Sequence, residues 1–283
     1  LDLGVGRIVV DSELEIEQLG KLATDMGKTA HILLRTAPGV DPHTHAKIST
    51  GQADTKFGLN ITSGAAMSAI KLALRTPGVL LHGIHAHVGS QLLDSEAHQV
   101  AADVLSQLLR DARDSTGFVA EELVLGGGLG IRYQRSDEPP TIHRFVETLV
   151  TAVERGIATY GIERPEVGVE PGRSIIGEAG TTLYTVGPIK PVPITESPGS
   201  RTYVSVDGGL SDNPRPVMYD ARYMALVANR AADQAEHPYR VSGKHCETDM
   251  LIPEVWLADP RPGDVLAVQC TGAYNYAMAS NYN

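Results

Sequence analysis

The sequence predicts an α/β protein in which part of a (β/α)8 barrel is followed by a C-terminal β-rich domain. Over residues 1–180, apolar strand-like runs alternate with amphipathic helical runs, an order typical of a parallel sheet. Residues of unusual type also gather directly after three successive strands: two histidines, then three glycines, then a glutamate with an arginine. A barrel brings such residues together, because the loops that follow its strands share one mouth.

Each strand is an apolar run, and each helix has apolar residues at helical spacing. The strands are predicted at 7–12, 30–36, 79–89, 122–128 and 166–172. The helices are predicted from residue 12 to about Met26, and then at 63–75, 95–114 and 141–160. Asp11 or Ser12 is the expected N-cap of the first helix and Ser63 that of the second, because their side-chain oxygens can accept a hydrogen bond from a first-turn N–H.

The division into domains follows from the number of units and from a change in composition. Five strand–helix units precede residue 180, so we interpret 1–180 as the C-terminal five of eight barrel units, in a chain cut at its front. Residues 181–283 are rich in Pro, Gly, Thr, Val and Tyr and predict a β-rich domain, with the short β-type runs "TTLYTVGPI", "RTYVSVDGG" and "GDVLAVQC".

Composition limits the class of partner. The 283 residues carry a net charge of −10, which argues against nucleic acid and against an anionic membrane. No apolar run is long enough to span a bilayer, and we find no signal peptide. Two cysteines are too few for a disulfide framework, so we expect a protein of the reducing cytoplasm.

Three glycines end the strand in "LVLGGGLGIRY", residues 123–133. One interpretation is a phosphate group cradled by backbone N–H groups, and the other is a tight turn or close packing between elements. The spacing is not that of a dinucleotide fingerprint or of a P-loop, so the glycines alone favour neither interpretation.

The segment "VEPGRS", residues 169–174, places Glu170 after a Val-Gly-Val run that we expect to be buried. Because an unpaired buried charge is costly, Glu170 with its glycine turn suggests a ligand that has both a basic nitrogen and a phosphate. The alternative is a surface ion pair between Glu170 and Arg173.

The segment "HAHVGSQ", residues 85–91, places His85 and His87 two residues apart on a strand, where both can face the barrel interior. They are either half of a metal site, or one imidazole stacks on an aromatic ligand while Ser90 binds its phosphate. The other strand ends offer glycines and one glutamate, so we expect no metal. His82 is interpreted as a core histidine on the opposite face.

Six motifs in order carry a family resemblance: "HAHVGSQ", "GGGLG", "VEPGRS", "DGGLSDNPRPVMY", "GKHCETD" and "TGAY". The sequence resembles the pyridoxal-phosphate-dependent amino-acid decarboxylases of the alanine-racemase-like barrel fold, and within them the diaminopimelate decarboxylases, over essentially its whole length. The resemblance implies a barrel, a β-domain and a homodimer with active sites at the subunit interface.

The resemblance also implies a site for pyridoxal 5′-phosphate (PLP). His87 would stack on the pyridine ring, Glu170 would pair with the ring nitrogen, and Tyr274 would touch both phosphate and substrate. Keeping the ring nitrogen protonated makes the ring a strong electron sink. The residues assigned to the cofactor are His87, Ser90, Gly127, Gly128, Glu170, Pro171, Gly172, Arg173 and Tyr274.

By the same resemblance the reaction is decarboxylation of meso-2,6-diaminopimelate to L-lysine and CO2, the last step of lysine biosynthesis. Cys246, from the partner subunit, would return a proton and is catalytic together with His87. An arginine fork suits a carboxylate because it donates two parallel hydrogen bonds. The residues assigned to the substrate are Arg173, Arg215 and Tyr219 for the non-reacting carboxylate, Glu247 for the distal ammonium, and Tyr274.

Some features depart from the family pattern. "CETD" is one residue shorter than the usual spacing before Asp249, and the chain stops at "MASNYN" before the family's final strands. The Tyr-Ala-x-Lys motif of the cofactor lysine does not occur, and Lys56 in "TKFG" matches a different family motif. We therefore expect the 283-residue polypeptide alone to be inactive.

Two alternatives stay open: an ornithine, arginine or carboxynorspermidine decarboxylase, and a non-catalytic decarboxylase-like binding protein. The segment "NPRPVMY" argues against the first, because simple diamine-forming substrates have no far carboxylate for Arg215 to bind.

Overall fold

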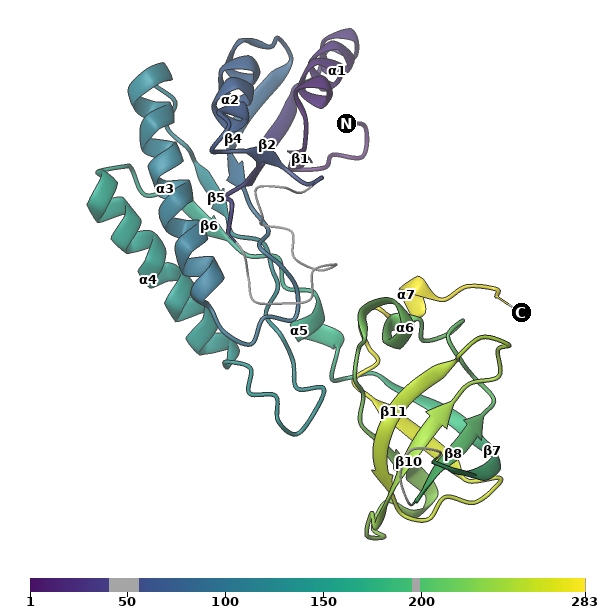
Figure 1. Cartoon of the computed structure of the whole chain (residues 1–283). Coiled ribbons are helices and arrows are strands. Elements are labelled where there is room, and N and C mark those ends of the chain that lie inside the picture. The colour runs from purple at the N-terminus through teal and green to yellow at the C-terminus, as the bar shows by residue number, and fades with distance from the viewer. Residues whose placement is uncertain (41–55, 195–198, 283) are drawn as a thin grey trace. The chain divides into compact units, whose positions relative to one another are not determined.

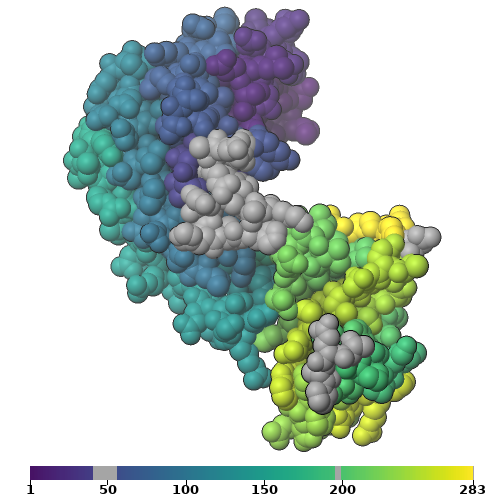
Figure 2. All heavy atoms as spheres, in the orientation of Figure 1, coloured from purple at the N-terminus to yellow at the C-terminus, as the bar shows by residue number. Residues whose placement is uncertain are grey.

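The computed structural model describes residues 1–40, 56–194 and 199–282. Its chain forms two compact units (Figure 1). The first unit comprises Leu1–Gly130 and Pro139–Pro171, and the second comprises Ile131–Glu138 and Gly172–Asn283. In Figure 2 the purple to teal atoms belong chiefly to the first unit and the green to yellow atoms to the second.

The first unit is a parallel sheet with helices between its strands. The strands in the order β1-β2-β4-β5-β6 are Ile8–Val10, Ala30–Ala37, Val79–His85, Glu122–Val124 and Glu166–Gly168, and the short strand β3, Leu59–Asn60, pairs with β2. The helices α1 to α4 are Glu13–Asp25, Ala65–Arg75, Glu96–Thr116 and Ile142–Tyr160. All the pairings are parallel, which confirms the predicted α/β class with the unit order of a partial barrel.

The N-terminus of α1 confirms one of the two predicted caps. The Ser12 side chain accepts a hydrogen bond from the Glu15 N–H, and the Glu15 carboxylate accepts one from the Ser12 N–H at 3.0 Å, so the two residues form a capping box. The N-cap of α2 is not the predicted Ser63, although the Ser63 Oγ accepts a hydrogen bond from the Ala65 N–H of the first turn at 3.4 Å. α2 begins one residue later, with Gly64 at the N-cap in the left-handed region (φ 83°), because Ser63 belongs to the preceding turn and donates its N–H to Asn60 Oδ1.

The core of the first unit lies between one face of the sheet and the helices that cover it (Figure 1). Burying each large aliphatic side chain contributes about 1.5–3 kcal/mol, so this layer supplies most of the unit's stability. Its fully buried large residues are Ile32, Leu34, Ile84 and Leu123 from the strands and Ile16, Ile70, Leu105 and Leu149 from the helices.

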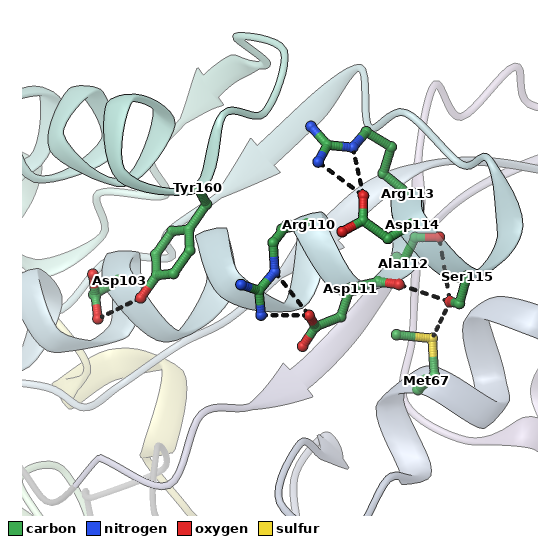
Figure 3. Close-up of polar contacts among 9 residues, drawn as sticks. All are labelled: Met67, Asp103, Arg110, Asp111, Ala112, Arg113, Asp114, Ser115 and Tyr160. Atoms are coloured by element: carbon green, nitrogen blue, oxygen red, sulfur yellow. Dashed lines mark hydrogen bonds and ion pairs between the residues drawn. The ribbon is translucent and has the colours of Figure 1, made fainter.

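Helices α3 and α4 pack closely because of a small residue. A Cβ atom on Gly156 would lie 2.2 Å from Ser106 Oγ, so a larger side chain would force the helices apart. On the solvent side, the Tyr160 hydroxyl of α4 donates to Asp103 Oδ2 of α3 at 3.2 Å, and Ser115 of α3 contacts Met67 of α2 (Figure 3). None of the helices in the described ranges is long and apolar enough to cross a membrane.

The second unit is a mixed sheet with short helices. Its strand order is β11-β10-β8-β7-β12-β9, and the neighbours are antiparallel except for β10 and β8. In chain order, the strands β7 to β12 are Thr181–Pro193, Ser200–Val206, Ala225–Val227, His237–Ser242, Met250–Leu257 and Val265–Gln269. The helices α5, α6 and α7 are Arg173–Ile176, Arg215–Tyr219 and Asn275–Met278, and Ala228–Arg230 is a 3-10 turn. The predicted β-rich C-terminal region is confirmed.

Candidate active site

His87 lies just beyond the end of β4, where its ring is held by the glycine run. The Gly127 N–H donates to His87 Nδ1 at 3.2 Å, so the ring proton is on Nε2. Burial, followed by the charge of Arg35 and the neighbouring His85, lowers the pKa of His87 to about 4. The imidazole is therefore neutral at pH 7, as a ring that stacks on an aromatic cofactor should be.

The histidine ring signals should show this shift directly. We expect an NMR titration of the chain to give His87 a pKa near 4, with the signal assigned by its loss in His87→Asn. Because the unfolded chain binds this proton more tightly, the free energy of unfolding should fall as the pH drops from 6.5 towards 4. A signal that titrates near 6.5 would contradict the buried, Gly127-bonded geometry.

The glycine run is required by the chain's own backbone. A Cβ atom on Gly127 would lie 2.2 Å from the Glu170 carbonyl oxygen, and one on Gly128 would lie 2.3 Å from the Gly89 carbonyl oxygen. Gly126 and Gly128 also have positive φ angles, 69° and 105°. Within the described ranges no group accepts a hydrogen bond from the Gly128 N–H. Close packing thus explains the glycines, and it leaves a donor that suits a phosphate.

His98, on α3, holds the same loop from behind and was missed by the sequence analysis. Its Nε2–H donates to the Gly127 carbonyl oxygen at 2.8 Å, and its side chain is 1% exposed. Burial lowers the pKa of His98, which keeps the ring neutral. The sequence could have indicated His98, because this histidine lies on the apolar face of the predicted helix, where a buried polar side chain needs a hydrogen-bond partner.

Glu170 does not have the predicted burial. Its side chain is 51% exposed and Val169 is exposed as well, because β6 ends at Gly168 and the next two residues lie beyond the covered part of the sheet. The carboxylate is paired, however: the buried His85 donates Nε2–H to Glu170 Oε2 at 2.9 Å. His85 thereby becomes a partner of the predicted cofactor carboxylate.

In the part of the chain that the structure describes, His85 and His87 belong to no group of three potential metal ligands. Within the described ranges, the group of three potential ligand side chains that lie within 4.8 Å of one another is Glu236, His237 and Asp259, all exposed on the second unit. The interpretation of His82 as a core histidine is confirmed, since it is buried, with its ring nitrogens 2.7 Å from His31 and 2.6 Å from Glu121.

The first unit therefore brings five predicted residues to neighbouring strand ends. Ser90, in the loop after β4, is half-buried and adjoins Gly89, whose carbonyl approaches Gly128. The Leu92 N–H donates to the Gly128 carbonyl oxygen at 2.9 Å, which ties this loop to the glycine run. The five residues are His87, Ser90, Gly127, Gly128 and Glu170, with Pro171 at the end of the unit.

The second unit holds a cluster of two buried arginines with tyrosine rings and an asparagine, which we call the arginine–tyrosine cluster. Arg173 and Arg215 are 4% and 5% exposed. Arg173 donates to the Tyr133 hydroxyl and lies 5.0 Å from the centre of the Tyr274 ring. Arg215 lies 5.5 Å from the Tyr219 ring. The members of the cluster are Tyr133, Arg173, Arg215, Tyr219, Tyr223, Tyr274 and Asn275.

Gly172 allows one of these contacts. A Cβ atom at this position would lie 2.7 Å from the Tyr274 hydroxyl oxygen, so only glycine lets that hydroxyl approach the backbone. Two residues that the sequence analysis assigned to the same ligand thus lie side by side, at the start of α5 and at the N-cap of α7.

Among the described residues, the charge of Arg215 has no acidic partner. No carboxylate in the described ranges forms an ion pair with it, although its side chain is almost fully buried. A buried guanidinium without a counter-ion is costly, and its planar fork matches a carboxylate. The geometry of Arg215 is thus compatible with an anionic partner.

The loop 243–249, between β10 and β11, carries the last predicted residues. Cys246 and Glu247 are exposed, and the Tyr282 hydroxyl donates to the Glu247 carboxylate, which lowers the pKa of that carboxyl. Among the contacts of the described residues, none joins Cys246 or Glu247 to the arginine–tyrosine cluster.

Asp249 has a structural part in the same loop. Its carboxylate is 5% exposed and accepts the N–H groups of Leu210 at 2.9 Å and of His245 at 3.1 Å. A Cβ atom on Gly209 or on Gly243 would lie 2.1 Å from Asp249 Oδ2, so both glycines make room for it. Asp249 thus holds the backbone of the loop that carries Cys246 by hydrogen bonds, although "CETD" is one residue shorter than the family spacing.

Comparison with known proteins gives a consistent set of relatives. Residues 1–177 match the family model of the pyridoxal-binding domain of pyridoxal-dependent decarboxylases. Diaminopimelate decarboxylase of Bacillus subtilis is 46% identical over 284 residues, which cover 100% of this chain and 64% of that protein. The chain thus spans 64% of the length of this curated relative.

Two solved structures share the fold over the whole chain. Diaminopimelate decarboxylase of M. jannaschii, in complex with L-lysine, aligns with a TM-score of 0.86 at 34% identity and is covered over 63% of its length. The Helicobacter pylori enzyme, also in complex with L-lysine, aligns with a TM-score of 0.86 at 28% identity, over 66% of that chain.

Proposed function

Because this chain belongs to the pyridoxal-dependent decarboxylases, we propose that it supplies most of the active site of an enzyme that converts meso-2,6-diaminopimelate to L-lysine and CO2. The observation that carries the choice of substrate is Arg215, a buried cation without a carboxylate partner in the described ranges. Diaminopimelate has an amino-acid group at each end, and the end that does not react offers the missing carboxylate.

PLP is the cofactor of this family, and the residues at the strand ends fit it. The neutral His87 ring suits the face of a pyridine ring, the Gly128 N–H suits a phosphate oxygen, and the Glu170 carboxylate suits a protonated ring nitrogen. We assign the phosphate also to Ser90, Gly127, Tyr274 and the backbone of Gly172 and Arg173, with Pro171 shaping the turn. When bound, PLP draws away the electron pair that departing CO2 leaves behind.

The remaining chemistry belongs to this chain's own side chains. His85 orients Glu170 through its Nε2–H, so that the carboxylate is fixed before the cofactor arrives. Arg173, Arg215 and Tyr219 bind the carboxylate of the non-reacting end, and Glu247 binds the distal ammonium. The Cys246 Sγ delivers a proton to the carbon atom that has lost CO2.

We further propose that the enzyme is a cytoplasmic homodimer with shared active sites. Cys246 and Glu247 are exposed on their own chain, which suits residues that complete a site in the partner subunit. Both cysteines are free thiols, which suits a reducing compartment. An ornithine-type or arginine-type decarboxylase suits the cluster less well, because its substrate leaves Arg215 without a counter-ion.

The test uses a chimaera in which the whole 283-residue chain is joined to the segments of the Bacillus subtilis relative that lie outside the match. With PLP, it should release CO2 from meso-diaminopimelate and form L-lysine in equal amount. Ornithine and arginine, offered at the same concentration, should release little CO2. A preference for either of these substrates would contradict the proposed function.

The 283-residue polypeptide itself should be inactive, because the motif of the cofactor lysine does not occur in it. After incubation with PLP and reduction with borohydride, mass spectrometry should find no unique lysine adduct, and no CO2 should be released. One stoichiometric adduct on a lysine of this chain, accompanied by turnover, would disprove the expectation. The chimaera serves as the positive control.

A further inference from the structure

Tyr223, just before β9, links two other members of the arginine–tyrosine cluster. Its side chain is 3% exposed, and its ring meets the Tyr133 ring edge to face at 5.4 Å between centroids. Its hydroxyl lies 3.0 Å from Arg215 Nε and 3.4 Å from Asn275 Oδ1. No sequence motif pointed to either Tyr223 or Asn275.

The direction of these hydrogen bonds follows from the chemistry of the groups. A guanidinium can only donate, so the Tyr223 oxygen accepts the proton of Arg215 Nε–H. The phenolic proton then goes to the carbonyl oxygen of the Asn275 amide. Burial raises the pKa of Tyr223, so the hydroxyl keeps this proton at neutral pH and the chain Arg215–Tyr223–Asn275 remains intact.

The hydrogen bonds that join Arg215, Tyr223 and Asn275 determine which nitrogen atoms of Arg215 can contact a ligand. Because Nε is engaged by Tyr223, the guanidinium has its terminal pair, Nη1 and Nη2, for a carboxylate. The rings of Tyr219 and Tyr133, at 5.5 and 6.0 Å from the guanidinium carbon, further limit its rotation. The buried Asn275 Nδ2 has no hydrogen-bond partner in the described ranges, which adds an unused donor in the same cluster.

We propose that Tyr223 is a positioning residue that sets the substrate specificity of this site. It holds Arg215 so that Nη1 and Nη2 receive the carboxylate of the substrate end that does not react, and Asn275 anchors Tyr223 in turn. The inference rests on the proposed function, since it assigns a role in recognising a substrate with two amino-acid ends.

The test is carried out on the chimaera with Tyr223→Phe, which removes the hydroxyl and keeps the ring. L-lysine retains the carboxylate of the non-reacting end, whereas cadaverine has the same two nitrogens without it. The inhibition constant of L-lysine and the KM for diaminopimelate should rise about tenfold, as expected for a lost charge-assisted hydrogen bond. The inhibition constant of cadaverine and kcat should stay within about twofold, because the carboxylate contact is the same in ground and transition states.

Two further variants keep the test decisive. Tyr239→Phe is the matched control. The Tyr239 hydroxyl donates to Asp259 at 2.9 Å and lies outside the cluster, so its removal should change neither the inhibition constant of L-lysine nor that of cadaverine. Asn275→Ala should also raise the inhibition constant of L-lysine, by a smaller factor than Tyr223→Phe does. The absorbance of bound PLP reports whether each variant is folded.

The outcomes separate the inference from the function on which it rests. If Tyr223→Phe raised the inhibition constants of L-lysine and cadaverine by the same factor, or raised neither, the positioning role would be overturned. If the unmodified chimaera bound lysine no better than cadaverine, the proposed function itself would fail before any variant was compared.

Discussion

Replacing Arg215 with alanine in the chimaera should lower kcat/KM for meso-diaminopimelate by a factor of about thirty to several thousand. This range corresponds to roughly 2–5 kcal/mol, the usual cost of removing one partner of a desolvated charge pair. The effect should be large because Arg215 is 5% exposed and no described carboxylate shares its charge, and the proposed function makes the substrate's carboxylate its counter-ion. Steady-state release of CO2 measures it.

The same variant should still bind PLP, because none of the residues assigned to the cofactor's ring contacts Arg215 in the described structure. Arg240→Ala is the matched control: that arginine also lies over a tyrosine ring, Tyr203 at 6.0 Å, but on the β10 strand away from the cluster. If Arg215→Ala turned over diaminopimelate almost as well as the unmodified chimaera, the assignment of the far carboxylate would be wrong.

Replacing Cys246 with alanine should lower kcat by about 10²–10⁴-fold, the usual contribution of a positioned proton donor. KM should change much less, because the thiol acts on the carbon atom after CO2 has left. Cys270→Ala is the control, since Cys270 is buried against the Arg132 carbonyl oxygen and burial raises the pKa of its thiol. If the Cys246→Ala enzyme kept an undiminished kcat, a group other than Cys246 would have to deliver the proton to the carbon atom that has lost CO2.

The position of Cys246 in the partner's site can be tested by mixing two inactive chimaeras. A Cys246→Ala subunit keeps Glu170, and a Glu170→Ala subunit keeps Cys246, so a mixed dimer has one intact site if Cys246 acts in the partner. Activity should then return towards a quarter of the unmodified level at equal mixing, since about half of the dimers would be mixed and each would hold one working site. Under conditions where subunits exchange, a lack of recovery would place Cys246 in its own subunit's site.

Local patterns were enough for the fold class. Apolar periodicity depends only on neighbours along the chain, so the strands and helices from β1 to α4 could be predicted within a few residues, except for the two-residue strand β3, which was not predicted. The cap of α1 could be narrowed to Asp11 or Ser12, and the structure selects Ser12, whose capping-box partner Glu15 is three residues away. The gathering of His87, Gly128 and Glu170 followed from the topology, since parallel strands end at the same edge.

What only the tertiary structure decided were the partners of these residues. His85 meets Glu170 across 85 positions of sequence, and Tyr223 meets Asn275 across 52, separations at which no local pattern carries information. Glu170 was expected to be buried because its neighbours are apolar, but its exposure depends on where β6 ends in the sheet. Hydrogen-bond partners and solvent exposure are set by which backbones approach one another in three dimensions, as at Gly127 and Gly128, and that approach is a property of the packed chain.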